Sequence, residues 1–100
     1  MAALKVGLDQ FARHDIDEIS QWYEKISLQV RKRFSAELNS ALRKIQEYPK
    51  GFPTAYKDFR KIIIRHFPYS VIYRIKPDEI TVYAVIHMSR NPTNWLARIQ

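Results

Sequence analysis

The strongest constraint on the fold is a pair of amphipathic segments that meet at Ser27. The first segment repeats apolar residues at spacings of three and four, the period of a helix with one apolar face: Ala12, Ile16, Ile19, Tyr23 and Ile26. The second continues the same period with Val30, Phe34, Leu38, Leu42, Ile45 and Tyr48. Asp9 and Ser27 are suitable N-caps, because their side-chain oxygens can accept hydrogen bonds from free backbone N–H groups. So short a connection predicts an antiparallel helix hairpin, and its apolar face needs a partner.

Strands predicted on either side of the hairpin supply that partner. Leu4–Leu8 alternates before the first helix, and the Pro- and Gly-containing segment 48–53 ends the second. Three more strands are predicted at Phe59–His66, Tyr69–Ile75 and Ile80–His87, with a turn at residues 76–79 between the last two. We therefore expect an α+β fold of order β-α-α-β-β-β, in which the helix hairpin packs on one face of a small, mainly antiparallel twisted sheet and a short C-terminal tail follows.

The two faces of this sheet follow from one assumed pair, Tyr73 opposite Val82. The apolar face, which would receive the hairpin, then holds Val71, Tyr73, Ile75, Ile80, Val82, Ala84 and Ile86, joined by Ile62 and Ile64. The opposite face would show Lys61, Ile63, Arg65, Ser70, Ile72, Arg74, Thr81, Tyr83, Val85 and His87. Because no helix is predicted to cover it, this mixed face is the expected working surface.

Length and composition exclude several classes of protein. One hundred residues are enough for one domain, so residues 1–100 are expected to form a single unit. No apolar run approaches the roughly 20 residues of a membrane span, and no secretory signal is recognised, so a cytoplasmic location without a membrane partner is expected. The chain has no cysteine, and its three histidines show no metal-ligand spacing. We therefore expect neither a metal nor a cofactor.

Charge is concentrated in the second half of the chain. Residues 1–49 carry eight Lys/Arg and seven Asp/Glu, a balance of +1, whereas residues 50–100 carry nine and three, a balance of +6. Attraction to an anionic partner would therefore act mainly through the later strands and the tail. The tail from His87 to Gln100 adds a histidine, two arginines and a tryptophan at the point where the sheet ends.

Taken in order, these segments resemble the RelE/ParE superfamily of small bacterial toxins. The likeness rests on Asp15-Ile16 with Ile19 and Tyr23, on the second helix leading into residues 48–53, on Tyr69–Ile75, and on Ile80–His87 followed by Arg90 and Trp95. RelE-like members enter the ribosomal A site and cleave messenger RNA, whereas ParE-like members inhibit DNA gyrase. The resemblance implies a cognate antitoxin that wraps the toxin and forms a hetero-oligomer with it, as in plasmid-stabilisation systems.

The side chains that RNA cleavage needs are incomplete in this chain. In the RelE-like pattern an arginine follows the tyrosine that opens the middle strand, but here Tyr69 is followed by Ser70, and no tyrosine follows Tyr83. Arg90 matches the family's next arginine only with a shift of one residue. His87 remains a candidate acid or base, with Arg65, Arg74 and Arg90 as partners; the alternative is a strand-end residue hydrogen-bonded to the tail.

The sequence therefore favours a ParE-like toxin that inhibits gyrase by binding, with a ribosome-dependent ribonuclease as the alternative. A third possibility is a toxin-like domain that binds antitoxin but inhibits nothing. The candidate target-binding residues are Arg65, Arg74, Tyr83, His87, Arg90, Trp95 and Arg98. For Trp95 a lid on the core edge is the alternative, and Trp22 is expected to pack against the core.

Overall fold

A computed structural model describes residues 4–89 and 93–98 of the protein. The elements in chain order are β1 (Lys5–Leu8), α1 (Gln10–Ile26), α2 (Leu28–Glu47), β2 (Thr54–Tyr56), β3 (Phe59–Ile63), β4 (Tyr69–Ile75), β5 (Glu79–His87) and α3 (Thr93–Leu96). The strands form one sheet in the order β1-β5-β4-β3-β2, in which β1 is parallel to β5 and the other neighbours are antiparallel.

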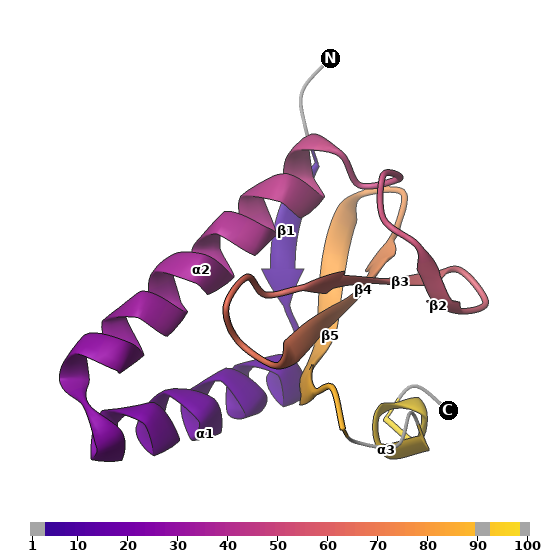
Figure 1. Ribbon diagram of the computed structural model, residues 1–100. Helices are drawn as coiled ribbons and strands as arrows, with labels where there is room; N and C mark the ends of the chain where they lie inside the picture. Colours follow the sequence, from indigo (N-terminus) through magenta and orange to yellow (C-terminus); the bar gives the residue numbers. More distant parts are fainter. Residues whose placement is uncertain (1–3, 90–92, 99–100) are drawn as a thin grey trace.

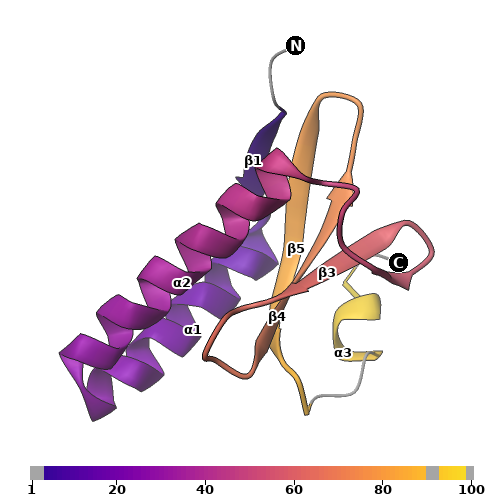
Figure 2. The same ribbon diagram turned by 45° about the horizontal axis from the view of Figure 1, so that its top comes forward.

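The two long helices cover one face of this sheet, and α3 lies apart from them near the other face (Figure 1). The turned view in Figure 2 shows α1 and α2 side by side along the same flank of the sheet. The predicted α+β fold, with a helix hairpin on a mainly antiparallel sheet, is confirmed. One short strand, β2, was not predicted and forms a hairpin with β3 at the far edge.

The caps that bound the helices are those predicted. Asp9 Oδ1 accepts a hydrogen bond of 2.9 Å from the Ala12 N–H at the start of α1. Ser27 ends α1 and begins α2, where its Oγ accepts from the Val30 N–H at 3.4 Å. A single residue, Ser27, thus joins the two helices.

The main core lies between the hairpin and the sheet. Phe34 and Ile45 from α2, together with Val71, Tyr73 and Val82 from the sheet, are all fully buried in it. The Tyr73 hydroxyl donates a 2.7 Å hydrogen bond to the carbonyl of Pro49, just beyond α2, and burial raises the pKa of this tyrosine. This bond fastens the middle strand to the end of the helix hairpin.

A bulge in β5 corrects the predicted assignment of the two faces. Tyr73 does pair with Val82, but the next pair is Ile72 with Ala84, so Tyr83 is an extra residue without an opposite number. One extra residue turns every later side chain to the other face. Ala84 and Ile86 were therefore wrongly placed on the hairpin face, and Val85, opposite Val71, was wrongly placed on the open one.

The register also moves His87 from its predicted face. It pairs with Tyr69, on the hairpin side of the sheet. The strand predicted at Phe59–His66 is shorter than expected, because β3 ends at Ile63 and Arg65 lies in the turn that follows. His66 in that turn adopts the left-handed region, with φ 68°, which a strand cannot contain.

Three aromatic or aliphatic residues predicted to be buried are exposed instead. The exposed fractions are 60% for Trp22, 63% for Ile26 and 66% for Tyr48. Ile26 is the last residue of α1 and Tyr48 is the C-cap of α2, whereas Trp22 lies beside the end of β5, where it lines a surface pocket with Tyr69 and His87. The helical period alone could not show which of these side chains the rest of the fold covers. Among the described residues, no helix is both long and apolar enough to cross a membrane.

The Tyr73 hydrogen bond predicts a measurable loss in the variant Tyr73→Phe. The free energy of unfolding should fall by about 1 kcal/mol, because the Pro49 carbonyl loses its donor in a partly buried position. Tyr48→Phe, at an exposed tyrosine, is the matched control and should change stability by less than about 0.5 kcal/mol. Urea unfolding of both variants measures the difference; equal stabilities would show that this bond contributes nothing.

Candidate functional site

The end of β5 has no strand neighbour on one side. β1 pairs with β5 only as far as Leu8 beside Val82, and α1 then begins, so the later residues of β5 face this helix. Asp15 of α1 supplies the missing hydrogen-bond partner: its Oδ2 accepts from the Val85 N–H at 3.0 Å. The Asp15 residue is only 8% exposed. A buried carboxylate needs more than one neutral donor, and the second comes from the C-terminal segment.

Arg98 binds the same carboxylate through both of its terminal nitrogens. Nη1 lies 2.6 Å from Asp15 Oδ2 and Nη2 lies 3.0 Å from Oδ1, an arrangement in which the guanidinium fork matches the carboxylate. These hydrogen bonds raise the pKa of Arg98, against the opposing effect of its burial. The guanidinium also lies 5.4 Å from the centre of the Phe11 ring. We call Asp15, Val85 and Arg98 the Asp15 clamp.

The clamp changes the interpretation of Arg98 as a target-binding residue. Its guanidinium is engaged within the chain, 83 residues from its partner in sequence, and fastens the C-terminal segment to α1. Sequence reasoning named Asp15 only as part of the family resemblance and did not assign it to the site. The available signal was an acidic residue between Ala12 and Ile19, on the side of α1 that these two residues bury.

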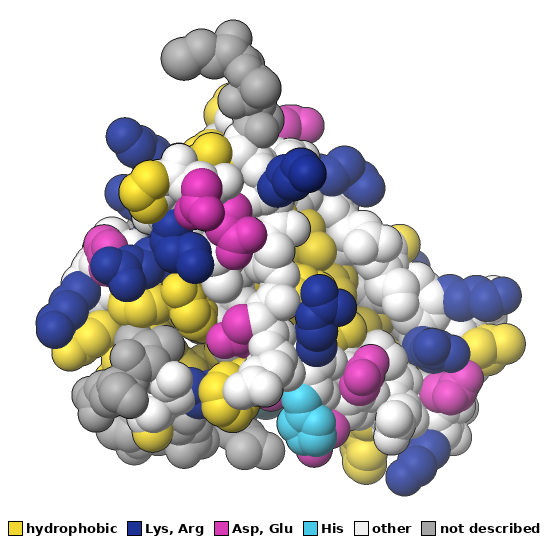
Figure 3. Space-filling model, turned by 180° about the vertical axis from the view of Figure 1, so that it is seen from behind, with side chains coloured by type: hydrophobic (Ala, Val, Ile, Leu, Met, Phe, Trp, Pro, Cys, Tyr) yellow, Lys and Arg dark blue, Asp and Glu magenta, His cyan; other side chains and the backbone are white. Residues whose placement is uncertain are grey.

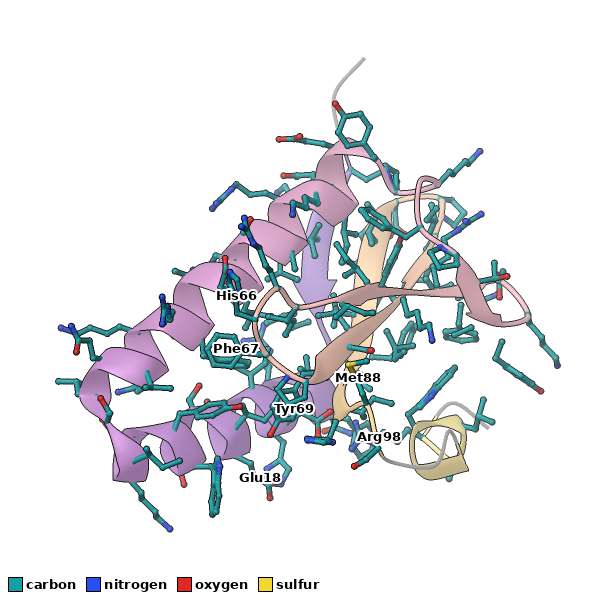
Figure 4. The ribbon with its side chains drawn as sticks, viewed as in Figure 1. Glu18, His66, Phe67, Tyr69, Met88 and Arg98 are labelled. Carbon is teal, nitrogen blue, oxygen red and sulfur yellow. The ribbon has the colours of Figure 1, made fainter. Side chains whose placement is uncertain are left out.

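A groove of about 510 Å³ lies beside the clamp, between α1 and the end of β5. Besides the clamp residues, its walls include Glu18, Trp22, Tyr69 and His87. Figure 4 shows the labelled side chains of Glu18, Tyr69 and Arg98 close to the lower end of β5. The groove is open to solvent and mixed in polarity, so it is suited to side chains of a partner.

His87 lies at the rim of this groove with two neighbours. Its ring centre is 5.2 Å from that of Tyr69 in an edge-to-face arrangement. Its Nδ1 lies 3.1 Å from the Ser89 N–H and 2.7 Å from the Ser89 Oγ. These contacts are those of a strand-end residue hydrogen-bonded to the tail, one of the two alternatives for this histidine.

The second face of the sheet is partly covered. Trp95 of α3 is 3% exposed, and its ring packs 5.7 Å from that of Phe59 and 6.3 Å from that of Tyr56. Tyr83, half-buried, packs 5.4 Å from Phe59 on the same face. The indole of Trp95 therefore acts as a lid in this structure, and a stacking role for it in target binding would require α3 to move.

The arginines proposed for catalysis do not meet. Arg74 pairs with Asp58 at 2.9 Å and lies 5.4 Å from the centre of the Phe59 ring. It is five residues along β4 from Tyr69, the partner of His87, which corresponds to about 17 Å at the rise of an antiparallel strand. Arg65 lies in the exposed turn between β3 and β4, and Arg90 lies outside the described residues.

Charge is also more dispersed than the sequence implies. Three of the cations of the second half, Arg74, Lys76 and Arg98, are each paired with an acid. Seen from behind, Lys and Arg side chains are spread over the surface with acidic side chains between them (Figure 3). Among residues 4–89 and 93–98, no cluster of histidine and acidic side chains could hold a metal ion.

A third surface joins exposed apolar side chains with cations at the end of β3 and β5. Ile63 is 52% exposed and Met88 56% exposed, and the Met88 N–H bonds to the Pro68 carbonyl in the turn that carries Arg65. Lys61 and His87 line a cavity of about 240 Å³ beside Met88. We call Lys61, Ile63, Arg65, His87 and Met88 the turn surface.

Comparisons with known proteins identify relatives for this architecture. The model of the family "ParE toxin of type II toxin-antitoxin system, parDE" matches residues 6–92. The toxin ParE2 of Mycobacterium tuberculosis is 30% identical over 64 residues, which are 64% of this chain and 61% of that toxin. The putative toxin Y4kP of Sinorhizobium fredii is 32% identical over 73 residues, 72% of this chain and 75% of the relative.

Two solved structures share the fold. A chain of the chromosomal ParDE toxin–antitoxin system of P. aeruginosa superimposes with a TM-score of 0.73 and 17% identity, over 85% of this chain and 96% of that one. A mutant of the E. coli toxin RelE in the free state superimposes with a TM-score of 0.64 and 19% identity, over 99% and 100%. Because both structures superimpose on this chain, the fold alone does not separate the two activities.

The Asp15 clamp predicts a large effect for Asp15→Asn. An amide cannot satisfy both the Val85 N–H and the Arg98 guanidinium, so the free energy of unfolding should fall by about 2–3 kcal/mol. This loss is smaller than the loss expected on breaking a fully buried ion pair, because Arg98 is partly exposed. Asp17→Asn, at an exposed position of the same helix, is the control and should be neutral. If chemical denaturation gives the two variants the same stability, the clamp does not stabilise the fold.

Proposed function

The chain belongs to the ParE toxin family of type II toxin–antitoxin systems, and from this premise we propose that it binds and inhibits DNA gyrase in the cytoplasm and is neutralised by a cognate antitoxin. The resemblance to the RelE/ParE superfamily drawn from the sequence is thereby confirmed. The alignment spans about 61% of the length of the ParE2 relatives, so the target and the neutralising partner belong to the proposal.

One observation carries the preference for binding over RNA cleavage: the side chains proposed for catalysis are apart and engaged elsewhere. Cleavage needs a base, an acid and a group that stabilises phosphorane charge within reach of one phosphate. Arg74 is held by Asp58 at the far end of β4 from His87, and the His87 Nδ1 is occupied by Ser89. Binding requires no such convergence.

The turn surface supports capture of a large target. Ile63 and Met88 are exposed, Lys61, His87 and Met88 line one cavity, and the Met88 N–H bonds to the turn that carries Arg65. Exposed apolar side chains together with charged ones are typical of protein interfaces. The cations would add attraction to gyrase with bound DNA. On this proposal Arg65 acts from the turn after β3, and His87 and Tyr83 act from β5. Arg74 and Arg98 contribute through their ion pairs within the chain.

One observation favours the ribonuclease alternative. Lys61 and His87 line the same cavity of about 240 Å³ on the second face, next to Ser70. A lysine and a histidine could stabilise charge and transfer a proton there. This alternative predicts that translation stalls with cut messenger RNA and that His87→Ala abolishes cutting while the fold is retained.

The proposal is tested by assaying gyrase supercoiling and cell-free translation side by side with the antitoxin-free protein. We expect inhibition of supercoiling and intact messenger RNA. We expect the same result from His87→Ala, with at most a few-fold loss of potency, since no proton transfer is involved. Cut messenger RNA that disappears in His87→Ala would replace the proposal with the ribonuclease reading; normal supercoiling at micromolar protein would refute it outright.

The turn surface gives a second expected outcome. Arg65→Glu reverses an exposed charge of this surface and should weaken gyrase inhibition at least tenfold. Lys44→Glu makes the same change on the outer side of α2 and should leave inhibition unchanged. Equal potency of the two variants would exclude the turn surface as the gyrase-binding site.

A further inference from the structure

The exposed apolar side chains of this protein are concentrated on α1 and at the tip of the helix hairpin. Of the seven large apolar or aromatic side chains that are exposed within residues 4–89 and 93–98, four lie between positions 11 and 28. They are Phe11, Trp22, Ile26 and Leu28. The hairpin therefore presents apolar side chains to solvent in addition to those that it buries against the sheet.

Helical spacing places three of these side chains on one face of α1, together with two acids. Phe11, Asp15, Glu18, Trp22 and Ile26 follow one another at intervals of four, three, four and four residues, which keeps them on one side of the helix. This side is about 22 Å long at the rise of an α-helix. Asp15, Glu18 and Trp22 also line the groove beside the Asp15 clamp. We call these five residues the α1 face.

The charge of α1 is opposite in sign to that of the whole chain. The helix carries two Lys/Arg and four Asp/Glu, a balance of −2, so the other residues carry +9 of the total of +7. Arg98 neutralises Asp15, which leaves Glu18 as the exposed acid of the groove. Exposed apolar side chains beside an exposed acid are complementary to a partner that carries apolar and basic side chains.

Glu18 and Trp22 together can receive one cationic side chain of such a partner. They are four residues apart on α1, so their Cβ atoms are about 5–6 Å apart. A guanidinium bound to Glu18 can therefore also contact the indole ring, which combines an ion pair with a cation–π contact. The present neighbour of Glu18 is the exposed His14, whose Nε2 lies 2.9 Å from Oε1. An arginine is always charged and is the stronger partner for a carboxylate.

We propose that the α1 face is the surface on which the protein part of gyrase docks, through a basic segment that places an apolar side chain against Trp22 and Ile26 and a Lys or Arg side chain against Glu18. The inference rests on the proposed function and adds a second contact surface to it. The cations of the turn surface attract bound DNA, whereas the carboxylate of Glu18 repels phosphate. Tryptophan is also among the residues that contribute most to binding when an interface buries them.

Charge separates this partner from the other occupants of an exposed apolar face. An acidic segment of an antitoxin and an anionic lipid surface would both meet the carboxylate of Glu18. A second copy that used the same face would bring together two helices with a balance of −2 each. All three pairings place like charges in contact, which weakens binding. A basic protein surface avoids this repulsion.

Binding of the labelled, antitoxin-free protein to purified gyrase, with and without DNA, tests the inference. Trp22→Ala with Ile26→Ser should weaken binding at least tenfold in both cases, because the contact is with protein. Tyr48→Ala removes an equally exposed aromatic ring at the C-cap of α2 and is the matched control, with affinity unchanged. Circular dichroism and urea unfolding verify that each variant retains the fold. Equal affinities of the double variant and the unchanged chain would overturn the inference.

A charge variant tests whether Glu18 itself makes the contact. Glu18→Lys should weaken binding to DNA-free gyrase at least fivefold. Asp17→Lys makes the same change at the next residue of α1, which is exposed and lies outside the groove, and should weaken binding less than twofold. Equal losses in the two variants would mean that only the net charge of α1 matters, which contradicts a contact at Glu18.

The outcomes distinguish this inference from the proposed function. If the unchanged chain neither binds gyrase nor inhibits supercoiling, the proposed function is refuted and the inference is refuted with it. If the unchanged chain inhibits gyrase and the double variant is equally potent, the inference alone is refuted. In that case, loss of antitoxin binding by the double variant would assign the α1 face to the antitoxin, and loss of concentration-dependent dimers would assign it to a second copy.

Discussion

The structure around the end of β5 depends on the hydrogen bonds of one buried group, the carboxylate of Asp15. It satisfies the Val85 N–H where β5 has lost its neighbour strand, and it holds Arg98 through two hydrogen bonds. Three segments far apart in sequence therefore meet at one buried group. Because a buried carboxylate without its partners is costly, α1, β5 and the C-terminal segment are fixed relative to one another, and so are the grooves between them.

A second constraint follows from the bulge at Tyr83. It reverses the faces of the last residues of β5, so Val85 packs under the hairpin while Ala84 and Ile86 join Trp95 on the other side. The main core thus lies on the hairpin face of the sheet, and a smaller core with aromatic side chains lies on the second face. The margin of this second face remains exposed to solvent, and there the turn surface combines exposed apolar side chains with cations. On our proposal this margin serves for contact, because Arg74 is about 17 Å along β4 from the partner of His87 and the two cannot act on one phosphate.

Much of the fold could be predicted because it follows from local periodicity. The helices, the caps Asp9 and Ser27, and the pair Tyr73–Val82 all depend on residues within a few positions of one another. The site depends on long-range contacts that no period encodes. Asp15 and Arg98 are 83 residues apart, and the bulge leaves no mark in the alternating run from Ile80 to His87. The short strand β2 and the exposure of Trp22 likewise depend on contacts that the local period does not encode.

We propose that this chain captures gyrase and does not act at the ribosome. The most direct measurement is the partition of labelled, antitoxin-free protein between purified gyrase with DNA and purified 70S ribosomes, present together at equal concentration and separated by sedimentation. We expect the labelled protein to sediment with gyrase, its binding to saturate as its concentration rises, and the ribosome fraction to contain none of it. Recovery of the label with the ribosomes would contradict it.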